Sequence, residues 1–365
     1  MIILAIETSC DDTCVAVVKV KGGKLPDFQI LSNIVSSQVK IHAKYGGVYP
    51  FLAKREHQKN LPIIFEKAKK ETKKPKFDLI AVTVGPGLEP CLWVGVNFAK
   101  ELAKKLKVPI VPVNHIEAHI YANWLKPICV KFEIRNSKFE TTNIFPAICL
   151  VVSGGHTQLI LMRNFGKYKI LGETRDDAAG ECFDKAARIL GLGYPGGPAI
   201  AQWAKKFKKT LRREFTMVNS LPRPMIYQKN YDFSFSGLKT AVLYLVKKNF
   251  YKNNQLTISN QQLAIISHEV QQAIIDVLIH KTLRAAKEHK VKTIILGGGV
   301  VANEELRKQF KSIVKCQMSN VKFFAPAKNL CTDNAAMVAV AGYFHREKGR
   351  KRKPEDIEAE ANQRL

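Results

Sequence analysis

Two histidines four residues apart give the most direct chemical signal in the sequence. His115 and His119 follow an apolar stretch and Asn114, a residue type that often caps a helix. A spacing of four places both imidazoles on one face of a helical turn, where they can share a metal ion. Glu117 points elsewhere, so the pattern is not the H-E-x-x-H of zinc peptidases. Structural histidines show the same spacing, and a metal site needs a third ligand, such as Asp333 or another distant acidic residue.

Three turns rich in glycine could bind an anion. They occupy residues 153–157 (SGGHT), 194–198 (YPGGP) and 297–299 (GGG). Glycine has no Cβ, so backbone N–H groups in such turns and at helix N-termini are accessible to phosphate. None of the turns matches G-x-x-x-x-G-K-[ST] or G-x-G-x-x-G, which favours a nucleotide site of another type. We interpret a fourth turn, residues 85–87, as a plain tight turn.

Carboxylates form a third set of chemically capable residues. Asp11 and Asp12 lie in a polar turn between two predicted strands, and Asp177 and Asp184 flank the start of a predicted helix. Near a phosphate-binding turn, carboxylates hold a cation, orient a ribose hydroxyl or accept a proton. Asp177 precedes an alanine and fits a helix N-cap. Asp184 lies one full turn into the helix, which favours ligand contact over capping.

These side chains need a framework that brings them together. Apolar runs over 2–7 and 14–20 predict two strands joined by a polar turn, and the same unit returns over 148–152 and 158–162. Two such hairpins about one lobe apart indicate a duplicated architecture. Further strands are predicted over 79–84, 110–113 and 293–296. Strands that alternate with helices favour mixed or largely parallel sheets with helices on their faces.

The remaining periodic segments predict helices. These span 61–72, 94–106, 181–190, 198–209, 237–249, 262–289, 303 onward and 334–344. A stripe of Trp203, Phe207 and Leu211 predicts that a surface helix continues to residue 213. Residues 126–143 show no clear periodicity and are interpreted as a surface insertion. Residues 347–365 are charged with few apolar residues, which predicts a frayed tail.

Composition narrows the class of protein. The 365 residues are 46% hydrophobic, which excludes global disorder, and their number predicts two domains or two lobes around a cleft. No run reaches the roughly 18 apolar residues of a membrane span, and residues 1–12 lack a signal-peptide pattern. Eight scattered cysteines without redox or zinc-ribbon spacing are typical of free thiols in a reducing cytosol.

The net charge of +27 favours a polyanionic partner such as nucleic acid. Of the 58 basic residues, 44 are lysines, which also fits a lysine-rich composition spread over every surface. The charge therefore suggests a class of partner without identifying it.

Together, the strings of residues resemble one family, the tRNA threonylcarbamoyl-adenosine transferases of bacteria and organelles. The resemblance runs from residue 2 to about 344, with several strings in the family's order, which makes it highly specific. They are 6–13 (IETSCDDT), 45–48 (YGGV), 114–119 (NHIEAH), 152–158 (VSGGHTQ), 176–185 (DDAAGECFDK), 194–198 (YPGGP), 232–240 (DFSFSGLKT), 297–307 (GGGVVANEELR) and 331–337 (CTDNAAM).

The resemblance implies an α/β fold of the actin, hexokinase and Hsp70 (ASKHA) type, with two ribonuclease-H-like lobes around a nucleotide cleft. We therefore expect an N-terminal lobe of residues 1–113, to which a final helix over 334–346 returns. Residues 114–333 would form a C-terminal lobe with the metal and adenylate sites and the insertion 126–143, followed by the charged tail 347–365.

The resemblance also implies the residues of the site. His115, His119 and Asp333 match the family's ligands for one divalent metal ion, with Fe²⁺ favoured and Zn²⁺ as the alternative. The positions that match the adenylate site are Val151, Val152, Ser153, Gly154, Gly155, Asp184, Gly197 and Asn303. Asp11 or Asp12 could take the proton of the attacking amine, although an activated anhydride can also react with loss of that proton to solvent.

The implied reaction transfers the threonylcarbamoyl group from threonylcarbamoyl-adenylate to N6 of the adenosine 3′ of the anticodon, in tRNAs that read codons beginning with A. AMP leaves, and the metal serves as Lewis acid and template. Besides tRNA, the expected partners in bacteria are a degenerate paralogue bound through the N-terminal lobe and a small ATPase, in the cytoplasm and without a membrane. Two alternatives stay open: a zinc metallopeptidase, which needs a base beside the metal, and a non-catalytic ASKHA nucleotide-switch module, which does not need the metal residues.

Overall fold

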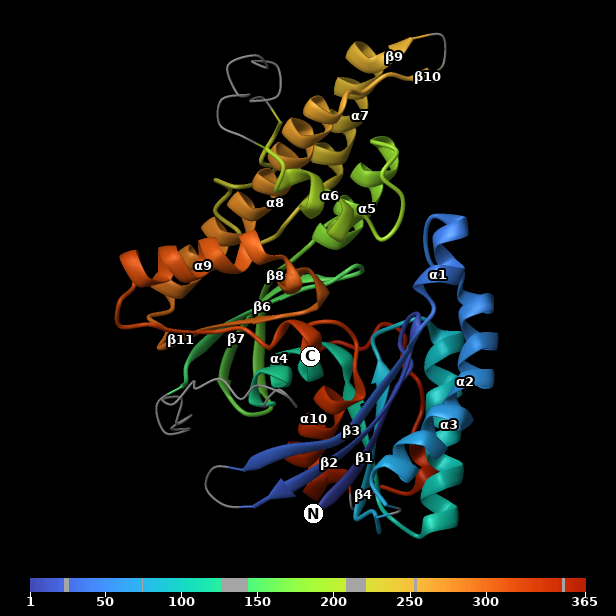
Figure 1. Cartoon of the computed structure of the whole chain (residues 1–365). Coiled ribbons are helices and arrows are strands. Elements are labelled where there is room, and N and C mark those ends of the chain that lie inside the picture. The colour runs from blue at the N-terminus through green and yellow to red at the C-terminus, as the bar shows by residue number, and fades with distance from the viewer. Residues whose placement is uncertain (23–25, 74, 126–143, 208–220, 253–254, 350–351) are drawn as a thin grey trace.

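The computed structural model describes residues 1–22, 26–73, 75–125, 144–207, 221–252, 255–349 and 352–365. Two five-stranded mixed sheets, each covered by helices, form two lobes (Figure 1). The predicted α/β fold with two lobes is thereby confirmed. The predicted insertion, 126–143, lies outside the described residues.

The first sheet has the strand order β3-β2-β1-β4-β5. Its strands are β1 (Ile2–Glu7), β2 (Asp12–Lys21), β3 (Asp27–Ser37), β4 (Leu79–Gly85) and β5 (Ile110–Asn114). The first three strands are antiparallel, and β4 and β5 are added parallel to β1. The loop between β1 and β2 therefore lies at the same edge of the sheet as the C-terminal ends of β4 and β5.

The second sheet repeats this topology, with the order β12-β11-β6-β7-β8. Its strands are β6 (Ala147–Val152), β7 (Thr157–Asn164), β8 (Lys167–Glu173), β11 (Thr293–Gly297) and β12 (Lys322–Phe324). Again three antiparallel strands come first, and two parallel strands follow on the other side of the first one. The predicted duplication is therefore confirmed for the topology of the two sheets. The turn between β6 and β7 occupies the same position in the second sheet as the turn between β1 and β2 in the first.

Most of the strands are buried on both faces, which explains their continuous apolar runs. In β1, Ile3 and Ala5 face a core between the two sheets, whereas Leu4 and Ile6 face the outer helices. In β6, Cys149 and Val151 face the same central core.

The helices form three layers around the sheets. α2 (Pro50–Glu71) and α3 (Glu89–Leu106) cover the outer face of the first sheet, and α4 (His115–Tyr121) and α10 (Ala335–Gly349) lie between the sheets (Figure 1). The second sheet is covered by α5 (Ala179–Ile189), α6 (Gly196–Ala204), α7 (Ser236–Phe250), α8 (Asn260–Glu288) and α9 (Glu304–Gln317). Shorter elements are α1 (Val39–His42), β9 (Tyr251–Lys252), β10 (Gln255–Leu256) and the 3₁₀ turns Ala43–Tyr45, Ala122–Trp124, Gly299–Ala302, Lys328–Leu330 and Pro354–Asp356. Among the described residues, no helix has the length and apolar character needed to cross a membrane.

Two expectations from the sequence are wrong. The helix that begins at Gly196 ends at Ala204 instead of continuing past Trp203 to residue 213, and residues 208–220 lie outside the described part of the chain. Residues 352–365 are not a frayed tail. Ile357 is buried among the outer core of the first lobe, and the backbone N–H of Glu360 donates to Val84 O over 2.7 Å.

Candidate metal and nucleotide site

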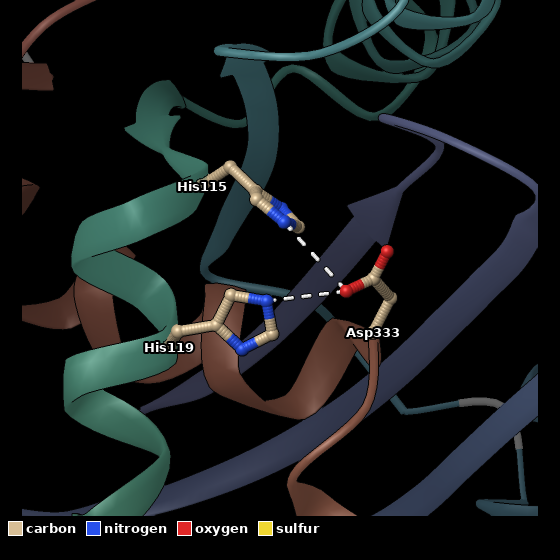
Figure 2. Close-up of side chains that lie close together, drawn as sticks. All are labelled: His115, His119 and Asp333. Atoms are coloured by element: carbon tan, nitrogen blue, oxygen red, sulfur yellow. Dashed lines mark ion pairs between the residues drawn. The ribbon is translucent and has the colours of Figure 1, made fainter. Parts of the chain in front are cut away.

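Three predicted metal ligands come together at the boundary of the lobes (Figure 2). His115 and His119 project from α4, and Asp333 lies in the segment that precedes α10. Oδ1 of Asp333 is 3.1 Å from Nε2 of His119 and 3.6 Å from Nε2 of His115. Each residue offers one ligand atom, and these atoms lie within 4.8 Å of one another, a spacing that one metal ion can bridge.

The ends and the far side of α4 are fixed by polar contacts. Asn114 caps the helix as predicted, because its Oδ1 accepts from the N–H groups of Ile116 and Glu117 at 2.9 and 3.1 Å. The carboxylate of Glu117 points away from the metal ligands, where it accepts from the Tyr168 hydroxyl and pairs with His345, both at 2.7 Å. The two histidines therefore face Asp333, and the intervening carboxylate does not.

A buried carboxylate at the end of β1 sets the orientation of His115. Oε2 of Glu7 lies 3.0 Å from His115 Nδ1, and Thr83 donates to the same oxygen over 2.6 Å. Since a carboxylate can only accept, Nδ1 carries a proton, and Nε2, which faces Asp333, is the nitrogen left to bind a metal ion. The sequence interpretation missed Glu7; the available signal was a charged residue at the end of a strand that is otherwise apolar.

The electrostatics of the cluster fit a bound cation. Burial lowers the pKa of His115, but the carboxylates of Glu7 and Asp333 outweigh burial and raise the pKa to about 9. Burial raises the pKa of Asp333, but the two imidazoles outweigh it and lower the pKa to about 2. His119 is fully buried, and its ring nitrogens make no aligned hydrogen bond with the described residues. Two imidazoles and one carboxylate are a suitable donor set for Fe²⁺ or Zn²⁺.

A cleft of about 1490 Å³ opens between the lobes beside this cluster. It is lined by His115 and Asp333, and by predicted site residues of both lobes: Asp11, Asp12, Ser153, Gly154, Gly155, Asp184, Gly197 and Asn303. His119 lies beneath the lining. The side chains of Val151 and Val152 are fully buried in β6 and do not line the cleft. These two residues therefore contribute to the site through the strand that ends at the glycine turn.

The glycine turn between β6 and β7 has open space above it. A Cβ added to Gly154 or Gly155 would meet no atom within 4 Å. By contrast, Gly298 has φ +93° and a Cβ there would lie 2.3 Å from Val152 O. The first two glycines leave room for a ligand, whereas Gly298 is required by the close approach of two backbones. His156 follows in the same turn, and burial lowers its pKa to about 4, so it is neutral at pH 7.

Asp184 and Asn303 lie on the second lobe at the side of the cleft. Oδ1 of Asp184 accepts from the backbone N–H of Gly196 at 2.6 Å, which fixes the turn that carries Gly197. Burial raises the pKa of Asp184 above its usual value. Oδ1 of Asn303 caps α9 by accepting from Leu306 N–H at 3.0 Å. Asp184 thus positions the cleft wall as well as lining it.

The turn between β1 and β2 places two carboxylates on the opposite wall. Burial raises the pKa of Asp12 to about 7 and also raises that of Asp11. A second residue missed from the sequence, His57 of α2, supports this turn: its Nε2 lies 2.9 Å from Cys10 O, and its Nδ1 lies 2.8 Å from the Thr13 hydroxyl. The turn is thereby tied to the helical layer of the first lobe.

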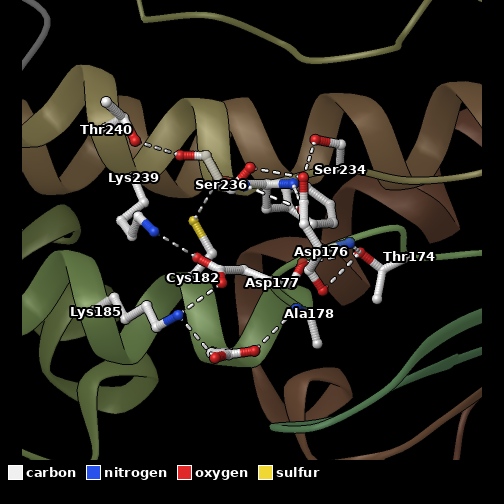
Figure 3. A network of polar contacts seen from close by, with 12 residues as sticks. Thr174, Asp176, Asp177, Ala178, Cys182, Lys185, Ser234, Ser236, Lys239 and Thr240 are labelled. Carbon is white, nitrogen blue, oxygen red and sulfur yellow. Dashed lines mark hydrogen bonds and ion pairs between the residues drawn. The ribbon is translucent and has the colours of Figure 1, made fainter.

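Asp176 and Asp177 hold the second lobe together and do not line the cleft (Figure 3). Asp177 does not cap α5 as predicted; it pairs with Lys185 at 2.6 Å and Lys239 at 3.3 Å. Asp176 accepts from the backbone N–H groups of Phe235 and Ser236 at the start of α7. The network holds α5 and α7 together and so fixes the helix that carries Asp184.

Sequence similarity relates the chain to proteins of one named family. A sequence model described as tRNA N6-adenosine threonylcarbamoyltransferase matches residues 29–340. Proteins of that name from Thermosipho africanus and Syntrophomonas wolfei are 46% and 45% identical to the chain. The first alignment covers 96% of both chains, and the second covers 94% of this chain and 92% of the relative. Among solved structures, HypF in its phosphate- and nucleotide-bound form aligns over 97% of this chain and 56% of its own, with 12% identity and a TM-score of 0.47.

The identity, the coverage and the matched family agree with the resemblance seen in the sequence motifs. The chain belongs to the tRNA N6-adenosine threonylcarbamoyltransferase family, and it is an enzyme of the transferase class.

Proposed function

We propose that the protein transfers the threonylcarbamoyl group of threonylcarbamoyl-adenylate to N6 of the adenosine 3′ of the anticodon, in tRNAs reading codons that begin with A, and releases AMP. The observation that carries the proposal is that one cleft is lined by an open glycine turn and by His115 and Asp333, two members of the cluster that could hold a metal ion. The donor is a mixed anhydride, so the site needs to orient the reactants and stabilise charge rather than form a covalent intermediate.

The adenylate would bind along the second lobe. The N–H groups of Gly154 and Gly155 are accessible to a phosphate because no Cβ occupies the space above these two residues, whereas the N–H of Ser153 donates to His156 O within the turn. The Asp184 carboxylate and Asn303 line the same cleft and would contact the ribose and the base. This placement puts the mixed anhydride between the glycine turn and Asp333.

His115, His119 and Asp333 would hold one divalent ion, Fe²⁺ by preference or Zn²⁺. When bound, such an ion supplies Lewis acidity toward carbonyl and phosphate oxygens. Glu7 holds His115 with Nε2 facing the cleft.

Both Asp11 and Asp12 line the cleft, and we assign to Asp12 the role of accepting the proton lost by the attacking amine. Its pKa of about 7 leaves a substantial fraction ionised at neutral pH, and burial makes the ionised form a stronger base than an exposed aspartate. Because the anhydride is already activated, the expected contribution of this proton transfer is small.

The geometry gives no support to the peptidase alternative. Glu117 would have to be the base, yet its carboxylate is occupied by Tyr168 and His345 on the far side of α4. A non-catalytic nucleotide switch would leave the clustering of His115, His119 and Asp333 without a role.

The proposal extends to the surroundings of the enzyme. We place it in the cytoplasm, acting on tRNA, with a degenerate paralogue bound to the N-terminal lobe and a small ATPase as protein partners in bacteria. For the lobes themselves we propose a boundary between residues 113 and 114, with α10 assigned to the first lobe because it packs on that sheet.

The test is a transfer assay with threonylcarbamoyl-adenylate and unmodified tRNA, with the bacterial partner proteins added. Wild-type protein should form the modified nucleoside, His119→Ala should lose nearly all activity, and His280→Ala, which alters a histidine outside the cleft lining, should retain it. Absence of transfer by the wild type would refute the transferase proposal. Full activity of His119→Ala would refute only the metal assignment.

A further inference from the structure

Residues 352–365, here called the strap, cross the first lobe toward the cleft. Glu355 pairs with Lys104 of α3 at 2.7 Å, and Ile357 is buried in the outer core. The strap then passes the end of β4 so closely that a Cβ on Gly85 would lie 1.9 Å from Glu360 O. Gly87 N–H donates to Ala361 O over 3.1 Å. The end of the chain lies beside α4, between the two lobes (Figure 1).

At this point the strap contacts the residue that caps the metal-bearing helix. Nδ2 of Asn114 donates to Oε1 of Gln363 over 3.1 Å. Nε2 of Gln363 in turn donates to the Glu360 carboxylate over 3.2 Å. Because a carboxylate can only accept, Glu360 fixes which end of the Gln363 amide faces Asn114.

This contact determines how Asn114 is oriented. Its Oδ1 already accepts from two N–H groups of α4, so its NH₂ group must face an acceptor elsewhere, and Gln363 supplies that acceptor. His115 is the first residue of α4 and directly follows Asn114, and His119 lies one turn later. If the Asn114 side chain can rotate, its hydrogen bonds no longer hold the first turn of α4. The turn then frays, and the positions of both imidazole rings become less well defined.

We propose that Gln363 is a positioning residue of the metal centre: by holding the Asn114 cap, it fixes the first turn of α4 and so the geometry of His115 and His119. The inference rests on the proposed metal site. It gives the strap a role in the site, beyond covering apolar surface of the first lobe. Mutation of a residue that is hydrogen-bonded to a metal ligand typically lowers metal affinity 10–100-fold. Gln363 acts less directly, through Asn114, so we expect its loss to lower metal affinity about tenfold.

The experiment compares full-length wild type with Gln363→Met, which keeps the bulk and removes the acceptor, and with the double variant Glu360→Gln/Gln363→Glu. The double variant keeps an acceptor oxygen at 363 and lets the amide at 360 donate to it, so no two carboxylates face each other. Glu355→Ala is the matched control, because it loosens the strap at α3 without touching Asn114. Two readouts are taken: Zn²⁺ affinity by competition with a chromophoric chelator, and hydrogen–deuterium exchange of the metal-free protein over the peptide that contains α4.

We expect Gln363→Met to weaken Zn²⁺ binding about tenfold and to speed exchange in α4, whereas Glu360→Gln/Gln363→Glu and Glu355→Ala stay within twofold of wild type in both. Equal losses in Gln363→Met and Glu355→Ala would mean that the strap acts only through general stability, and would overturn the proposal. Unchanged affinity and exchange in Gln363→Met would overturn it as well. A wild type that binds neither Zn²⁺ nor Fe²⁺ would overturn it together with the metal site, whatever the transfer assay gives.

Discussion

Single contacts decide the chemistry of the metal cluster. His115 has a carboxylate on each side: Glu7 at Nδ1 and Asp333 at Nε2. Glu7 orients the ring, and Asp333 would bind the same metal ion as His115, an arrangement common around metal-bound histidines. Without a metal ion, a proton on His115 supplies the positive charge that both carboxylates require, so protons and metal compete for the same place.

Removing the charge of Glu7 should weaken metal binding. In Glu7→Gln, the amide oxygen can still accept from His115 Nδ1, but the negative charge that raises the basicity of the imidazole is gone. We therefore expect Zn²⁺ affinity to fall roughly 10–100-fold. The measurement is chelator competition at pH 7.5. Glu66→Gln, which alters an exposed carboxylate paired with Lys69, is the control. A change of less than twofold in Glu7→Gln would contradict the assigned role.

The buried carboxyl of Asp12 should make stability depend on pH. Burial raises its pKa from 3.8 to about 7, so its stabilising contribution is complete below about pH 4 and is lost as the pH rises through about 7. Asp12→Asn removes this loss. Relative to wild type, the variant should therefore gain roughly 2 kcal/mol in free energy of unfolding between pH 5 and pH 8.

Urea unfolding in the presence of a chelator measures this difference. Asp356→Asn, a change at an exposed carboxylate, should show no comparable gain. The same difference between Asp12→Asn and wild type at both pH values would show that Asp12 titrates normally.

Among the structural elements, the glycine turns are of two kinds: one leaves space for a ligand, and the other is required by close backbone packing. Alanine substitutions should distinguish them. Gly155→Ala adds a methyl group to open space, so the fold should be unaffected while the KM for the adenylate rises roughly tenfold through lost approach to the phosphate. Gly298→Ala places a Cβ against Val152 O at a φ of +93°, and should cost about 3 kcal/mol or more.

Thermal unfolding and steady-state kinetics on both variants test the distinction. Destabilisation of Gly155→Ala by as much as Gly298→Ala would mean that the first turn serves the fold rather than the ligand.

Elements with a clear apolar period were predictable, and those whose position depends on neighbours were not. The buried strands β1, β4, β6 and β11 appear in the sequence as apolar runs. Strand β8 at the edge of its sheet does not, because exposed lysines interrupt its pattern. The helix that contains Trp203 ends at Ala204, although the apolar spacing continues in the sequence to Leu211.

The three side chains of the cluster could be predicted from the sequence, whereas the residues that support them could not. His115, His119 and Asp333 follow from spacing and family motifs, whereas Glu7, His57 and Gln363 are brought in only by the packing of distant segments. Nothing local to Gln363 distinguishes it from a solvated residue. Its contact with Asn114 exists because the strap returns to the end of β4.

For the whole molecule, the net charge of +27 should govern how tightly tRNA binds rather than which nucleotide is modified. Lysine contacts to phosphates release counterions, so tRNA affinity should fall at least roughly tenfold between 50 and 200 mM salt. Filter binding or fluorescence anisotropy measures the fall, with AMP binding over the same range as the control. A tRNA affinity that stays within twofold would rule out this role for the lysines.

The return of α10 to the first lobe has a consequence for biosynthesis. Ala335 follows Asn114 by 221 residues, yet α10 packs on the inner face of the first sheet. At roughly 5–20 residues per second, the ribosome completes β5 about 10–45 s before it supplies that helix. During this interval the apolar side chains of β1, β4 and β5 that α10 later covers are exposed on the nascent chain. Folding of this protein should therefore depend on chaperones that shield the first lobe until translation is almost finished.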